Sequence, residues 1–117
     1  MTTIISILFF LILTIPNIVI AAQPHVAAGE YHTVGVNSDG TVMAMGWNLH
    51  GQSNVCNWKD IVQMAAGRSH SVGLKSDGTN VAVGLNDDGQ LNVETWTDIV
   101  QVAAGRSHSV GLKSDGT

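Results

Sequence analysis

Short runs of alternating apolar and polar residues fill the sequence after residue 26, and turn residues separate the runs. Side chains of an extended strand point alternately to its two sides, so His70, Val72 and Leu74 would share one face. Val81 and Val83 continue the alternation after an intervening Asp-Gly pair, and such a pair between apolar runs is a strong hairpin signal. The pattern therefore predicts antiparallel hairpins, with the same signal at residues 39–40 and 115–116.

Two further strands are predicted from the remaining apolar runs. One covers residues 61–65, and the other, with weaker alternation, lies around residues 91–96. Each unit of the sequence then holds three or four short strands. A sheet this small cannot bury both of its faces by itself, so it needs a neighbouring sheet.

The whole pattern repeats every 38 residues. Residues 65–79 recur without change as residues 103–117, and a diverged copy begins at residue 27. Histidines at positions 32, 70 and 108 keep the same spacing. Self-similarity at this period indicates a repeat architecture, in which thin sheets obtain a core by stacking on one another. The sequence predicts an all-β fold, a partial β-propeller of 38-residue antiparallel blades, with small Ala-Ala-Gly residues near the propeller axis.

The number of repeats predicts a longer protein. Residues 23–117 hold about 2.5 units, whereas propellers have about four to eight blades. The sequence also stops at Thr117 within a hairpin, so we expect further repeats downstream.

The first segment differs from the repeats. Residues 4–15 are nearly all large and apolar, Pro16 interrupts the run, small residues follow to Ala22, and no charged side chain precedes Glu30. This pattern predicts an apolar N-terminal helix over residues 1–22 that is either a cleaved signal peptide or an uncleaved anchor, with residues 4–22 in the membrane. Both alternatives place residues 23–117, the propeller repeats, outside the cytoplasm, as a secreted or cell-surface protein.

Composition narrows the range of partners and chemistries. Acidic residues outnumber basic ones nine to five, for a net charge of −4, and no cluster of lysine or arginine occurs, which excludes a nucleic-acid partner. The only cysteine, Cys56, is replaced by Glu94 in the next repeat, so the fold does not require sulfur there. The sequence contains no strand-to-helix glycine loop for a phosphate and no nucleophile–base pair.

The repeated histidines are the most conspicuous candidates for catalysis or metal binding. They occupy the same position in separate blades, on the apolar side of their strands, so they cannot form a compact ligand set. We interpret them as buried imidazoles that bond a neighbouring turn. Asp87 and Asp88 lack the ligand spacing of a calcium loop and fit turn chemistry. The sequence thus predicts no catalytic residue, no metal and no cofactor.

Positions that vary between otherwise equivalent repeats are better candidates for binding, because a scaffold keeps its repeated residues for folding and varies its loops. Glu30-Tyr31 becomes Arg-Ser in the later repeats, and Trp47 becomes leucine. Tyrosine, tryptophan and arginine commonly anchor protein interfaces. The predicted binding residues are Tyr31, Trp47, His50, Arg68 and Arg106. Trp58 and Trp96 repeat and are predicted to belong to the core.

From Val26 onward the sequence resembles the regulator of chromosome condensation repeat family. The resemblance rests on Ala-Ala-Gly-x-x-His, on Ser-Asp-Gly-Thr, and on Gly-x-Asn-x-x-Gly-Gln at residues 46–52 and 84–90. It implies a propeller of about seven blades. The compact repeat and the leader make the sequence more similar to short-repeat, secreted members, which grip a protein partner with loops at one end.

Three functions follow from these observations. The first is an extracytoplasmic, non-enzymatic scaffold that recognises a protein or glycan through its loops. The second, implied by the founding member of the family, is guanine-nucleotide exchange on a small GTPase. The third is an enzyme whose site lies in further blades, since the repeats seen here offer chiefly alanine and glycine near the axis.

Overall fold

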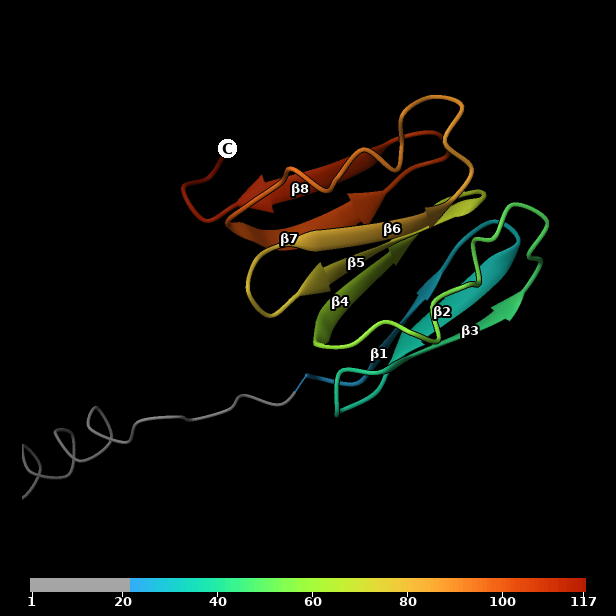
Figure 1. The fold of residues 1–117 in the computed structure, drawn as a ribbon, viewed down its shortest axis with the longest axis horizontal. Helices are drawn as coiled ribbons and strands as arrows, with labels where there is room; N and C mark the ends of the chain where they lie inside the picture. Colours follow the sequence, from blue (N-terminus) through green and yellow to red (C-terminus); the bar gives the residue numbers. More distant parts are fainter. Residues whose placement is uncertain (1–21) are drawn as a thin grey trace, which may run out of the picture.

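A computed structural model of the protein describes residues 22–117, which form eight strands in three antiparallel sheets (Figure 1). The first sheet contains β1 (His25–Ala28), β2 (His32–Val36) and β3 (Val42–Gly46). The second contains β4 (Ile61–Ala66), β5 (His70–Lys75) and β6 (Asn80–Gly84). The third contains β7 (Ile99–Ala104) and β8 (Ser109–Lys113). The all-β, antiparallel prediction is confirmed.

The expected N-terminal helix and nearly all of the expected leader lie outside the described residues. Within residues 22–117, no helix is long and apolar enough to cross a membrane.

The Asp-Gly signals mark hairpin turns between β2 and β3 and between β5 and β6, as predicted. The Asn37 N–H donates to the Thr41 carbonyl, and Gly40 adopts a left-handed φ of 81° that favours glycine. Asp39 Oδ1 accepts bonds from the Thr41 hydroxyl at 2.6 Å and the Thr41 N–H at 2.9 Å, which lower the pKa of Asp39. The same bonds recur at Asp77 and Asp115.

The strand predicted around residues 91–96 is wrong. The Val93 N–H donates to the Leu91 carbonyl and the Trp96 N–H to the Val93 carbonyl, so the chain turns twice within these residues. The turns bury Val93 and lay Trp96 over Gly111 of the next sheet. The apolar residues Val93 and Trp96 therefore pack from an irregular loop and do not belong to a strand. Each complete sheet has three strands.

The sheets stack face to face, as Figure 1 shows. β4 lies against β1 and β2 on one side, and β7 lies against β4 and β5 on the other. The three strands that end in Ala-Ala, β1, β4 and β7, therefore lie next to one another in the stack. Their small side chains permit this close approach. Two cores fill the two interfaces. The first is built on Val34, Val36, Val42, Val55, Ile61 and Met64, and the second on Ala65, Val72, Leu74, Ile99 and Val102.

Only the middle sheet is covered on both faces. In β5, Ser71 and Val72 point to opposite sides and both are fully buried. In β2 the alternate residue Thr33 is exposed, because one face of that sheet has no neighbour in the described chain. Trp58 packs on the first core and Trp96 on the second, so the prediction that both belong to the core is confirmed.

A three-part hydrogen-bond relay joins each sheet to the next. The Ser71 hydroxyl donates to the Gln52 carbonyl at 2.8 Å, and its oxygen lies 2.7 Å from His32 Nε2. A hydroxyl has one hydrogen, so the imidazole must be the donor in the second contact. The next interface repeats the arrangement with His70, Ser109 and Gln90. The relay links the Ala-Ala-Gly-x-x-His motif to the Gly-Gln motif.

A second set of bonds crosses the same interfaces. Gln63 Oε1 accepts the Val102 N–H at 2.7 Å, and His25 Nε2 accepts the Met64 N–H at 3.0 Å. A bulge between Ile61 and Gln63 interrupts the pairing of β4 with β5, and bulges re-aim side chains locally. Each of these inter-sheet bonds therefore joins two residues that are 39 apart in the sequence, one more than the repeat period of 38.

Two of the three repeated histidines are buried, as predicted, but their partners differ from the prediction. His32 and His70 bond strand serines of the following sheet rather than a turn. His108 is exposed, because no further sheet covers β8 in the described chain. Within residues 22–117, no three histidine, cysteine, aspartate or glutamate side chains are grouped to hold a metal ion.

The buried imidazoles make stability depend on pH. Burial lowers the pKa of His32 and of His70 from the ordinary value of 6.5, and the Nδ1 atom of each has no bonding partner. The unfolded chain therefore takes up protons at a higher pH than the folded chain does. The free energy of unfolding should have its maximum value above pH 6.5. It should decrease as the pH is lowered from 6.5, by up to about 1.4 kcal/mol per pH unit for each histidine.

Urea unfolding at a series of pH values measures this dependence. A His108→Gln variant, which changes only the exposed histidine of the set, should keep it. A urea midpoint that stays constant or rises on acidification below pH 6.5 would refute the burial of neutral imidazoles.

Candidate functional site

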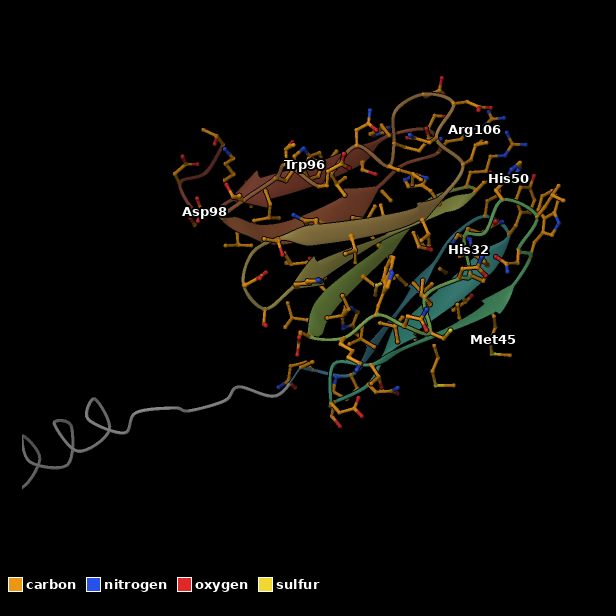
Figure 2. All side chains as sticks on the ribbon, in the orientation of Figure 1. His32, Met45, His50, Trp96, Asp98 and Arg106 are labelled. Atoms are coloured by element: carbon orange, nitrogen blue, oxygen red, sulfur yellow. The ribbon has the colours of Figure 1, made fainter. Side chains whose placement is uncertain are left out.

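The variable loops gather at one end of the stack. The turns after β1, β4 and β7 and the loops after β3 and β6 lie there, because an even number of strand reversals returns the chain to the same end. Figure 2 shows His32, His50 and Arg106 at this end, with Asp98 at the opposite end. The hairpin turns with the repeated Ser-Asp-Gly-Thr sequence occupy the opposite end.

Four of the five predicted binding residues come together here with Glu30, in what we name the loop-end cluster (Glu30, Tyr31, Trp47, His50 and Arg68). The rings of Tyr31 and Trp47 meet edge to face, with centroids 4.9 Å apart. The centroid of the His50 ring lies 6.2 Å from that of Trp47. Aromatic pairs in this geometry contribute about 0.5–1.5 kcal/mol beyond their buried area.

Arg68 comes from the second repeat and joins this cluster across the sheet interface. Its guanidinium carbon lies 5.6 Å from the centroid of the Tyr31 ring, within the range of a cation–π contact. Nη2 lies 3.5 Å from the Tyr31 hydroxyl, a contact that raises the pKa of Arg68, and Nε lies 3.5 Å from a Glu30 carboxylate oxygen. The arginine is thus held over the Tyr31 ring with its charge partly balanced.

The backbone under the cluster is the same in both complete repeats. The Trp47 N–H donates to the Tyr31 carbonyl at 2.8 Å, and the Leu85 N–H donates to the Ser69 carbonyl at 2.9 Å. The loop tips are also fixed alike, since the His50 N–H and the Asp88 N–H donate to the glutamines of the repeated Gly-Gln motif. The repeats therefore supply a constant frame, and only the first carries the aromatic side chains.

The cluster is partly exposed on this frame. Tyr31 is 37% exposed and Trp47 is 46% exposed, so each ring has a packed side and a free side. A shallow groove of about 560 Å³ opens beside them, lined by residues 29–33 with Met45 and Gly46. The arrangement offers a preformed apolar and cationic surface.

The remaining site predictions have mixed outcomes. Arg106 lies on the equivalent turn of the third repeat, exposed at the same end, outside the ring contacts of the cluster (Figure 2). Sequence reasoning missed Glu30, which pairs with Arg68, and Leu49, which is 69% exposed in the Trp47 loop. Both also differ between repeats, and this variation is the signal that could have found them.

A sequence profile described as "Regulator of chromosome condensation (RCC1) repeat" matches residues 25–52 and 61–90. The two matches span β1 to the Gly-Gln motif of the first repeat and β4 to that of the second. This chain belongs to the regulator of chromosome condensation repeat family. A comparison with curated protein sequences gives no significant match.

Several solved structures share the fold of this chain. Prp20p from Saccharomyces cerevisiae is 22% identical with a TM-score of 0.66, over 86% of this chain and 30% of its own. Human WBSCR16 is 23% identical with a TM-score of 0.63, over 79% of this chain and 33% of its own. The ectodomain of the Arabidopsis thaliana receptor kinase ACR4 is 21% identical with a TM-score of 0.61, over 80% of this chain and 33% of its own.

The chain thus spans about a third of the length of these structures. The TM-scores establish a shared fold, the stacked sheets of a regulator of chromosome condensation propeller, and identities under 25% carry nothing beyond the fold. Function rests on the site, since one fold carries many activities.

Proposed function

We propose that this regulator of chromosome condensation repeat protein is an extracytoplasmic binding scaffold that recognises a protein or glycan through the loop-end cluster. The observation that carries the proposal is the ordered contact of Tyr31, Trp47 and Arg68 on a frame that both complete repeats share. The frame is needed for folding, whereas the cluster is not, because the second repeat folds with Ser69 and Leu85 in its place.

The composition of the cluster suits recognition. Aromatic and arginine side chains supply most of the energy in protein interfaces, and rigid anchors lose little conformational entropy on binding. Trp47 contacts both Tyr31 and His50 before any partner arrives. Leu49 adds an exposed apolar side chain beside them. A partner that presents an apolar or sugar face to the rings and a polar group to Arg68 would match this surface.

The extracytoplasmic placement rests on the predicted leader over residues 1–22. The ACR4 neighbour is by its title an ectodomain of a receptor kinase, so this fold serves at least one protein outside the cytoplasm. Prp20p is by its title a protein with binding properties to Gsp1p and histones, so this fold serves protein recognition in at least one neighbour.

Alanine substitution tests the cluster. Trp47→Ala should weaken binding to a purified partner by about 2 kcal/mol, or about thirtyfold in Kd, while changing the free energy of unfolding by less than about 1 kcal/mol. Partners are sought by capture from the extracellular fraction and on a glycan array, and the affinity of each hit is then measured for the purified pair.

Leu85→Ala, at the equivalent backbone position of the second repeat, is the matched control and should keep full affinity. Equal affinity of the Trp47→Ala variant and the parent would exclude the cluster as the binding site. Acceleration of nucleotide release from a small GTPase would favour the exchange-factor alternative instead.

A further inference from the structure

The guanidinium of Arg68 is held in place, but its hydrogen-bonding capacity is not used up. Its two polar contacts, from Nη2 to the Tyr31 hydroxyl and from Nε to a Glu30 carboxylate oxygen, are both 3.5 Å long. Charge-assisted hydrogen bonds are usually about 2.7–2.9 Å long. A guanidinium has five N–H donors, and within residues 22–117 Nη1 makes no hydrogen bond. Arg68 therefore has donors left for a ligand.

The position of Arg68 is accessible even where sheets stack on both sides. The second sheet lies between the first and the third, and the Arg68 side chain is still 39% exposed. Asp87, in the loop after β6 of the same repeat, is exposed as well, and it is the equivalent of Leu49. The turn after β4 and the tips of the long loops are thus open to a partner in a stack that continues in both directions.

The loop next to Arg68 has lost the acidic residues of its repeat equivalent. Leu49 and His50 stand in the first repeat where the second has Asp87 and Asp88. An anion that approaches Arg68 over the first-repeat loop therefore meets an apolar side chain and an imidazole, without two carboxylates to repel it. The surface is complementary to a negatively charged group beside an apolar one, and such complementarity determines which partner is selected.

The exposed side chains favour a protein as the source of that group. Leu49 is 69% exposed and Trp47 is 46% exposed. An aliphatic side chain offers a sugar neither a hydrogen bond nor a ring to stack on, whereas it packs well against an apolar side chain of a protein. The planar fork of an arginine matches the two oxygens of a carboxylate.

We propose that the partner is a protein segment that presents a carboxylate side chain to Arg68 and an apolar side chain to Trp47 and Leu49, an inference that rests on the binding function proposed above. Glu30 and the Tyr31 ring hold the guanidinium through Nε, Nη2 and its face, which leaves Nη1 for the carboxylate of the partner.

Peptide selection tests this assignment. The complete 117-residue chain is immobilised and panned with a phage-displayed library of random peptides. Selected peptides should carry an aspartate or glutamate near a leucine, phenylalanine or tryptophan. A synthetic peptide of the selected sequence should bind Arg68→Gln at least about tenfold more weakly than the parent. Replacing its acidic residue by the amide should cost as much, and Arg68→Gln should then have no further effect.

Arg106→Gln is the matched control, since Arg106 holds the same turn position in the third repeat and Ser69 replaces tyrosine in the repeat before it. This variant should keep the affinity of the parent within about twofold. Circular dichroism and thermal unfolding verify that each variant is folded. Arg68→Lys replaces an unfolded Arg68→Gln variant and should also bind more weakly, because lysine lacks the planar fork.

Selected peptides without an acidic residue, or acidic peptides that bind Arg68→Gln as tightly as the parent, would overturn the proposal. If binding of those peptides is still lost in Trp47→Ala, the loop-end cluster remains the binding surface and only the carboxylate is wrong. If it is not lost, the proposed function fails as well. The absence of any selected peptide would also overturn the proposal, and binding to a glycan array would then identify a sugar as the partner.

Discussion

Gly67→Ala is expected to lower the free energy of unfolding by about 3 kcal/mol, at the upper end of overpacking effects. A Cβ at this position would lie 2.5 Å from the Gly105 carbonyl oxygen and would overlap the His70 ring. The carbonyl is backbone of the next sheet and the ring is fully buried, so neither can move aside cheaply. The effect arises at the interface between sheets, which makes it a measure of stacking.

Gly35→Ala is the matched control, because the nearest atom to its added Cβ lies 3.7 Å away, at ordinary contact distance. Urea denaturation of both variants and the parent gives the comparison. The control should change the free energy of unfolding by less than about 1 kcal/mol. Equal stability of the Gly67→Ala variant and the parent would mean that the second and third sheets are not held this closely.

His70→Ala should destabilise the chain by about 3 kcal/mol, whereas His108→Ala should change stability by less than about 0.5 kcal/mol. The two histidines hold the same repeat position, but His70 is fully buried and bonds Ser109, while His108 is exposed. Truncating His70 removes a buried ring and leaves a cavity between sheets. The pair therefore separates the effect of burial from the effect of residue type.

Thermal and urea unfolding of the two variants test this contrast. Similar losses for both variants, or a small loss for His70→Ala, would contradict the stacked arrangement of the second and third sheets.

Most of the fold could be predicted from the sequence because its signals are local. Asp39-Gly40 and its repeats specify hairpin turns through bonds within five residues. Alternation assigned the faces of β5 correctly, and the 38-residue period indicated stacking. The segment after residue 90 does not form the predicted strand, because the backbone bonds of Val93 and Trp96 to preceding carbonyls turn the chain, and such bonds leave no signal in the composition.

The histidine partners could not be predicted because they depend on the register between sheets. His32 meets Ser71, one residue beyond the repeat period, and alternation within a strand says nothing of this offset. The candidate site shows the same limit. Variation between repeats selected Tyr31, Trp47 and Arg68, but the contact of Arg68 with Tyr31 exists only because the second sheet lies over the first. Glu30 also varies between repeats, but its pairing with Arg68 depends on the same contact between sheets.

The most direct test of the stacked-sheet account is a double-mutant cycle between His70 and Ser109, which belong to different sheets and are bonded at 3.1 Å. The account predicts that His70→Ala and Ser109→Ala are non-additive, with a coupling energy of about 1 kcal/mol in the free energy of unfolding. Additive losses, equal within about 0.3 kcal/mol to the loss in the double variant, would contradict it.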